Sequence, residues 1–165
     1  MRHSRTVIVR QAQARVGIKE ESAAHHEIVD RYNAHKPLAF GYMTKYEDPW
    51  CATFISYLAI ITGYTDIIPT ECSCRRMIGL AGKMGIWQED DSYVPRPGDI
   101  ILYDWKDSGS GDDTGIPDHM GMVEKVTGGV ITVIEGNHQD AVGRREIAVN
   151  GQYIRGYILP RYDEE

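Results

Sequence analysis

The sequence predicts an α+β domain in which helices come first and an antiparallel sheet follows. In the first half of the chain the apolar residues recur with helical spacing, and glycines mark where helices end. From about residue 95 the apolar residues alternate or run continuously between turn residues, as they do in strands. Because 165 residues fit one domain, we expect a single domain over residues 1–165, with a helical part at about 1–88 and a sheet part at about 95–160.

Two helices are expected near the N-terminus. The first contains the apolar residues between Val7 and Val16 and ends at Gly17, because glycine is a common helix stop. The second runs over residues 25–34 and ends before Pro37, which cannot continue a helix.

Two further helices are expected in the middle of the chain. Aspartate is a favoured N-cap and proline is favoured at the first helical position, so we expect Asp48 to cap a helix that begins at Pro49. This helix continues to about Thr62 and ends at Gly63. A fourth helix is expected over residues 72–84.

Five strands are expected in the second half of the chain. The segment Thr127-Gly128-Gly129 lies between two apolar runs and predicts a hairpin, and Asn150-Gly151 joins the last two strands. A polar loop over residues 106–118 separates the first strand from the hairpin. The expected strands lie at 99–105, 120–126, 130–134, 144–149 and 153–159.

The composition argues against several classes of protein. A net charge of −6 disfavours a nucleic-acid partner, because binding to phosphates requires a basic face. The longest apolar stretch, residues 54–64, is far shorter than the ~20 residues that span a bilayer, so we expect no membrane insertion. The N-terminus lacks the apolar core and cleavage site of a secretory signal, so we expect synthesis in the cytoplasm without a signal peptide. We also expect a monomer.

The three cysteines are too few for a disulfide framework and indicate a reducing compartment. Cys72 and Cys74 are too close in sequence to pair comfortably, and we expect both to pack within the fourth helix. Cys51 differs, because it falls in the first turn of a helix, where the helix dipole and free backbone N–H groups lower the pKa of a thiol. The same N–H groups can bind an oxyanion. The alternative role for Cys51 is that of a small buried apolar residue.

His119 supplies a base for such a nucleophile. If Val126 pairs with Val130 across a three-residue loop, His119 faces Asn137, and Glu135 lies one diagonal away on the same face. An imidazole oriented by a third polar group is the arrangement of a catalytic triad. A surface histidine is the alternative, and a one-residue slip of the register would turn both partners away from His119.

The acidic loop offers oxygen ligands of the kind that calcium prefers. Its spacing does not match an EF-hand, so weak calcium binding competes with an ordinary solvated loop. The candidate ligands are Asp104, Asp107, Asp112, Asp113 and Asp118.

Four segments in this order resemble a CHAP domain, a family of cysteine amidases and endopeptidases that cut peptidoglycan. They are Trp50-Cys51-Ala52-Thr53-Phe54, Pro97-Gly98-Asp99-Ile100, residues 118–124 (DHMGMVE) and residues 131–137 (ITVIEGN). The resemblance covers about residues 45–160, and the upstream helices resemble those of phage-endolysin-like members.

The resemblance implies a papain-like fold and a role for each site residue. By this likeness Cys51 is the nucleophile, His119 the general base and then acid, and Glu135 the residue that orients the imidazole. Asn137 matches a second polar position that helps hold His119 or the oxyanion. Related NlpC-type enzymes typically orient the base with a second histidine, so the Glu-Gly-Asn sequence favours the CHAP branch. His138 is a rival, but it has the opposite strand parity to Glu135 and Asn137.

The expected activity is hydrolysis of a peptidoglycan amide bond, with no cofactor required. The bond is that between N-acetylmuramic acid and L-alanine, which we favour slightly, or one within the stem peptide or cross-bridge. The enzyme would reach the cell wall after release by an unknown route. Two alternatives stay open: a papain-like cysteine protease that acts on protein, and a non-catalytic module that binds the wall or a partner.

Overall fold

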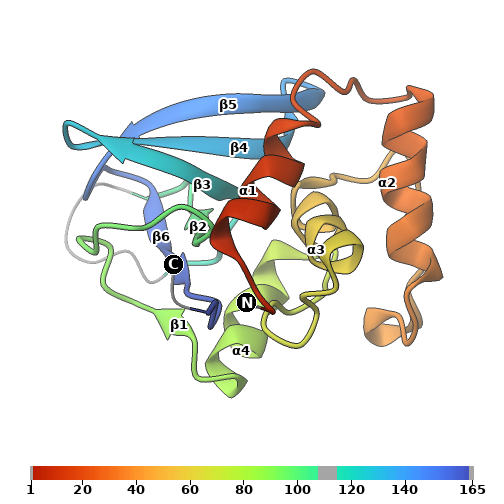
Figure 1. Cartoon of the computed structure of the whole chain (residues 1–165), viewed down its shortest axis with the longest axis horizontal. Helices are drawn as coiled ribbons and strands as arrows, with labels where there is room; N and C mark the ends of the chain where they lie inside the picture. Colours follow the sequence, from red (N-terminus) through yellow and green to blue (C-terminus); the bar gives the residue numbers. More distant parts are fainter. Residues whose placement is uncertain (1, 108–114, 164–165) are drawn as a thin grey trace.

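The computed structural model describes residues 2–107 and 115–163, and in them helices precede a six-stranded antiparallel sheet (Figure 1). This order confirms the predicted α+β fold. The helices are α1 (Arg5–Gln13), α2 (Ala23–Ala34), α3 (Cys51–Thr62) and α4 (Cys74–Lys83), with a short 3₁₀ helix, η1, at Ala39–Gly41. The strands are β1 (Trp87–Gln88), β2 (Ile100–Tyr103), β3 (His119–Thr127), β4 (Val130–His138), β5 (Ala141–Ala148) and β6 (Ile154–Ile158).

The sheet has the strand order β1-β6-β2-β3-β4-β5. The last two strands are joined near Asn150-Gly151 as expected, yet they do not pair with each other. β5 forms one edge beside β4, while β6 pairs with β2 and β1. Strand β1 was not predicted, because its two residues are too few to show the alternation of apolar and polar residues that marks a strand.

Helix α3 lies at the centre of the molecule, between α2 and the sheet (Figure 1). Residues 51–59 are all buried, and the helix packs against β3 and β4. Gly63 ends it in the left-handed conformation, with a φ of 78°, as predicted. No helix among residues 2–107 and 115–163 is long and apolar enough to cross a bilayer.

The predicted start of α3 is wrong. The N-cap is Trp50, which makes no side-chain cap hydrogen bond, and the helix begins at Cys51. The Asp48 carboxylate is already bound in the preceding loop, where it accepts hydrogen bonds from the Lys45 backbone N–H and the Tyr42 hydroxyl. Trp50 is instead anchored by its side chain, because the fully buried indole donates to Glu20 Oε1 at 2.8 Å.

The hairpin of β3 and β4 also differs from the predicted register. Its turn has two residues, Gly128 and Gly129, both with positive φ, so Thr127 rather than Val126 pairs with Val130. A bulge between Val123 and Lys125 then shifts the pairing by one residue. Beyond the bulge Met122 pairs with Ile134, which is the register that the sequence predicted for this end of the hairpin.

Candidate active site

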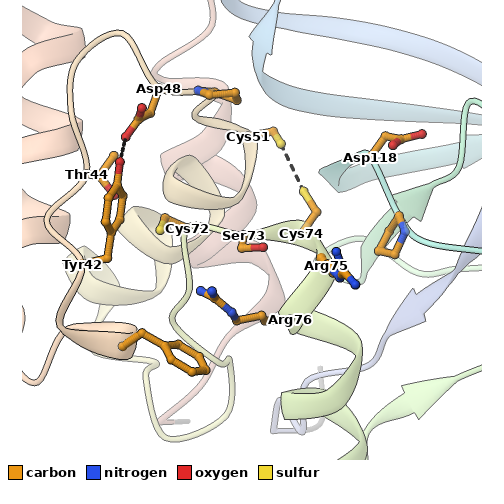
Figure 2. Close-up of a pocket in the computed structure, with 13 residues that line it drawn as sticks. Tyr42, Thr44, Asp48, Cys51, Cys72, Ser73, Cys74, Arg75, Arg76 and Asp118 are labelled. Atoms are coloured by element: carbon orange, nitrogen blue, oxygen red, sulfur yellow. Dashed lines mark hydrogen bonds between the residues drawn. The ribbon is translucent and has the colours of Figure 1, made fainter.

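Cys51 occupies the first position of α3 and faces a pocket between this helix, the start of α4 and the loop that precedes β3 (Figure 2). The side chain is almost fully buried, with 5% of its surface exposed. The first N–H groups of a helix lack partners within the helix, so they can bind an anion near Cys51. Gly136 allows β4 to pack this closely on α3, since a Cβ there would lie 2.5 Å from Phe54 Cβ.

His119 begins β3, and its Nε2 lies 3.0 Å from Glu135 Oε1. The side chains of His119 and Cys51 also interact directly. Burial lowers the pKa of His119, but the interactions with Cys51 and Glu135 outweigh it and raise this pKa to about 9. The structure therefore brings together three of the four residues that the sequence selected.

The pKa of Cys51 is lowered well below that of an ordinary thiol. The largest cause is a hydrogen bond with Cys74, and the interaction with His119 adds to it, while burial acts in the opposite direction. An imidazolium beside a buried sulfur favours the thiolate. The arrangement therefore favours a thiolate–imidazolium pair.

Glu135 is fully buried, and three side chains hold its carboxylate. Besides His119, Arg145 of the neighbouring strand β5 donates from Nε to both oxygens, at 2.8 and 3.1 Å, and His138 Nδ1 lies 3.2 Å from Oε1. Burial raises the pKa of Glu135, but the bonds from His119 and Arg145 outweigh it and lower the pKa. The carboxylate is thus fixed in its charged form beside the imidazole.

The strand-parity argument against His138 is wrong. Asn137 has a φ of 56°, and the pairing of β4 with β5 shifts between Glu135 and His138, so side chains no longer alternate there. His138 consequently points to the same carboxylate as His119. Asn137 is half-buried, and within residues 2–107 and 115–163 its side chain makes no hydrogen bond.

An aromatic layer flanks His119. The Tyr103 ring stacks on the imidazole at 5.9 Å, and Trp105 stacks on Tyr103 at 4.7 Å. The Arg145 guanidinium lies 4.8 Å from the centre of the Trp105 ring. These residues restrict how far His119 and Arg145 can move, and no motif assigned Tyr103 or Arg145 to the site.

The pocket beside Cys51 has a volume of about 720 Å³. Its lining includes Phe40, Tyr42, Cys51, Cys74, Arg76 and Asp118 (Figure 2). The Arg76 guanidinium lies 3.9 Å from the centre of the Phe40 ring and 3.5 Å from a Glu71 oxygen. The exposed Arg75 adds a second guanidinium to this part of the pocket, and the carboxylates of Asp48 and Asp118 also line it.

The expectation that Cys72 and Cys74 pack within the fourth helix is wrong for Cys72 and confirmed for Cys74, which is a buried residue of α4. Cys72 precedes α4, where its backbone N–H donates to Glu71 Oε1. Cys74 is the first residue of α4, and its Sγ lies 3.2 Å from Cys51 Sγ. This contact joins the starts of two helices and was not visible in the sequence, because 23 residues separate the two cysteines.

Metal ligands are sparse in the described part of the chain. Asp112 and Asp113 of the proposed calcium loop lie outside the described residues, while Asp104 and Asp118 accept hydrogen bonds from nearby backbone N–H groups. One group of three potential ligands occurs within residues 2–107 and 115–163, at Glu21, His25 and His26. His25 Nδ1 already accepts a hydrogen bond from the Glu21 N–H, so an ion bound there would have to displace this bond.

Comparisons with known proteins agree with the motifs. The CHAP domain model matches residues 41–137, more than half of the chain, and this range contains Cys51, His119, Glu135 and Asn137. None of the curated proteins matches the sequence. Two crystal structures of Ly7917 are similar to this chain. The structure with the hydrolyzing product of MDP has 16% identity and a TM-score of 0.41, and the other has 18% identity and a TM-score of 0.43. Each alignment covers 82% of this chain and 62% of the Ly7917 chain, so this chain spans less than two thirds of their length. Because this family model matches more than half of the chain, the chain belongs to the CHAP-domain family.

Proposed function

We propose that this protein is a cysteine-dependent peptidoglycan hydrolase in which Cys51, His119 and Glu135 form the catalytic triad. The observation that carries the proposal is the chain of contacts from the Cys51 thiol through the His119 ring to the Glu135 carboxylate, at the wall of an open pocket. Membership of the CHAP-domain family supports both the chemistry and the substrate class.

In the first half of the reaction the Cys51 thiolate attacks the carbonyl carbon of the scissile amide. The backbone N–H groups at the start of α3 stabilise the oxyanion of the tetrahedral intermediate. His119, held as imidazolium by Glu135, donates its proton to the leaving amine, and the C–N bond breaks to leave a thioester on Cys51.

In the second half water replaces the amine. The neutral His119 removes a proton from water, and the resulting hydroxide attacks the thioester carbon. Collapse of the second tetrahedral intermediate releases the carboxylic acid and restores the thiolate–imidazolium pair. The reaction uses the side chains of the protein and water, with no cofactor.

The side chains of the pocket favour a substrate that carries a carboxylate near the scissile amide. Arg75 and Arg76 offer guanidinium groups in the pocket, while its two carboxylates, Asp48 and Asp118, already accept hydrogen bonds from the protein. The stem peptides of peptidoglycan carry free carboxylates that a guanidinium can bind. We favour the bond between N-acetylmuramic acid and L-alanine, and a bond within the stem peptide or cross-bridge is the other candidate. We further propose an endolysin-like monomer that is made in the cytoplasm and reaches the wall after release.

The test is digestion of purified peptidoglycan followed by mass spectrometry of the soluble fragments, with Cys51→Ala as the inactive control. An amidase releases stem peptides with a free N-terminal alanine and leaves bare glycan. An endopeptidase instead leaves shortened peptides attached to muramic acid. Unchanged muropeptides with the reduced wild-type protein would refute the proposal. Casein cleaved under the same conditions would instead favour a protease that acts on protein.

A further inference from the structure

The described thiols are not equivalent, and two of them are joined by a hydrogen bond inside the pocket. Cys51 Sγ and Cys74 Sγ are 3.2 Å apart, and Figure 2 shows the two thiols pointing toward one another while Cys72 lies apart. All three cysteines are free. A disulfide bond has a length of about 2.05 Å, so a side-chain rotation that shortens the separation by roughly 1.2 Å would join the pair.

We propose that Cys51 and Cys74 form an oxidation site, in which Cys74 acts as the resolving cysteine and a reversible disulfide blocks the nucleophile. This inference rests on the proposed function only for its consequence, the loss of hydrolysis. The reagent is a small disulfide such as oxidised glutathione, which can enter because Cys51 and Cys74 both line the pocket of about 720 Å³.

The chemistry proceeds by two thiol–disulfide exchanges. The Cys51 thiolate attacks one sulfur of oxidised glutathione, forming a mixed disulfide on Cys51 and releasing one glutathione thiolate. The Cys74 thiol then loses its proton to that thiolate, and its sulfur attacks Cys51 Sγ. The intramolecular disulfide forms and a second glutathione thiolate leaves. Two protein thiols are oxidised, and one molecule of oxidised glutathione is reduced to two of glutathione.

The local charges set this order of events. In the reduced protein the bond to Cys51 and burial both raise the pKa of the Cys74 thiol, so Cys74 stays protonated and Cys51 reacts first. Once Cys51 is in a mixed disulfide, its negative charge is gone and no longer opposes ionisation of Cys74. The position of Cys74 at the start of α4 then favours its thiolate.

Cys72 is a poor competitor for this role. Its Sγ lies 3.7 Å from Glu71 Oε1, and its backbone N–H donates to the same oxygen. This contact holds the Cys72 sulfur against the Glu71 carboxylate, apart from the Cys51–Cys74 pair (Figure 2). Cys72 is therefore the matched control within the same pocket.

The test uses the full chain, incubated with oxidised glutathione and then alkylated with N-ethylmaleimide under denaturing conditions. Intact mass should show that alkylated cysteines fall from three to one, with no glutathione retained, and peptide mapping should place the cross-link between Cys51 and Cys74. Cys72→Ser should form the same cross-link. Cys74→Ser should instead retain glutathione on Cys51.

Hydrolysis of peptidoglycan, measured on the same samples, gives the functional consequence. Wild-type activity should fall to the background of Cys51→Ala after oxidation and return fully with dithiothreitol, each variant being compared with its own reduced form. A cross-link to Cys72, or a persistent glutathione adduct on wild-type Cys51, would overturn the inference. If the disulfide forms but the reduced protein leaves peptidoglycan intact, the proposed function fails and the oxidation site stands. If the reduced protein is active but no cross-link forms, the oxidation site alone fails.

Discussion

His119 Nε2 and Glu135 Oε1 lie 3.0 Å apart at the pocket end of two neighbouring strands, and Arg145 holds the same carboxylate from a third strand. The imidazole is thus fixed by the sheet itself. Because Nε2 is engaged with Glu135, Nδ1 is the ring nitrogen left for the proton exchange with Cys51.

Replacing the carboxylate tests this arrangement. Glu135→Gln keeps the shape of the side chain but removes the charge that stabilises the imidazolium, so we expect kcat/KM on peptidoglycan to fall by about 10²–10⁴-fold. Asn137→Ala is the comparison, since Glu135 rather than Asn137 contacts the ring, and we expect it to lower kcat/KM by less than about tenfold. A larger loss for Asn137→Ala than for Glu135→Gln would show that Asn137 orients the base.

The pH dependence follows from the two shifted groups. The pKa of His119 is raised to about 9, and the pKa of Cys51 is lowered, so we expect a thiolate–imidazolium pair between these two pKa values. We expect kcat/KM to be bell-shaped, with the alkaline limb near pH 9, where His119 loses its proton, and the acid limb well below the pKa of a free thiol.

The raised pKa of His119 also makes the stability of the folded protein depend on pH. The stability that the His119 proton contributes is fully present below the ordinary pKa of 6.5 and is lost as pH rises through about 9. Chemical unfolding at several pH values should show this loss, and His119→Ala should remove it. In the activity profile described above, an alkaline limb at the ordinary pKa of histidine would contradict the raised pKa of His119.

Gly121 provides space for the Glu135 side chain. A Cβ at Gly121 would overlap Val133 Cγ1 and lie 2.8 Å from Glu135 Cγ, so Gly121→Ala should cost about 1–3 kcal/mol and reduce activity by displacing the carboxylate. Gly79 is the matched control, because it is an exposed helical glycine with nothing near its missing Cβ. Gly79→Ala should gain about 0.5–1 kcal/mol and leave activity unchanged. Denaturant unfolding measures the stability change of each variant. Equal changes for Gly121→Ala and Gly79→Ala would contradict the close packing around Gly121.

Ser56 holds the segment before α4 against α3. Its hydroxyl donates to the Glu71 carbonyl at 2.8 Å and accepts from the Glu71 N–H at 2.9 Å, and the side chain is fully buried. Ser56→Ala leaves both backbone groups unpaired and should cost about 1–3 kcal/mol.

Thr53, one turn earlier in the same helix, gives the contrasting case. It is equally buried, but its hydroxyl has no hydrogen-bond partner within residues 2–107 and 115–163. Thr53→Val should therefore be neutral or slightly stabilising. Equal destabilisation by Thr53→Val and Ser56→Ala in thermal unfolding would refute the distinction.

The parts of the fold that follow from local pattern were predictable. The four helices, the end of α3 at Gly63 and five of the six strands follow from apolar spacing and glycine positions. The meeting of His119 with Glu135 was expected from a register that is wrong at the turn. A bulge at Glu124 restores the pairing, and a single extra residue of this kind has no compositional signal.

The remaining features depend on contacts between distant segments. His138 reaches Glu135 because Asn137 adopts a left-handed conformation, which an alternation argument cannot foresee. Cys74 meets Cys51 only through the packing of two helix starts. Asp48 does not cap α3 because a closer loop donor, the Lys45 N–H, occupies its carboxylate.

The most direct test of Cys51 activation is its rate of alkylation by iodoacetamide, measured for each cysteine by mass spectrometry between about pH 5 and 9. In the reduced wild-type protein Cys51 should react faster than Cys72 near pH 6, with little change up to neutrality. His119→Ala should slow Cys51 by about tenfold or more near pH 6, because the imidazolium that stabilises the thiolate is then lost. A wild-type Cys51 that reacts no faster than Cys72, or a rate that His119→Ala leaves unchanged, would contradict the proposed pair.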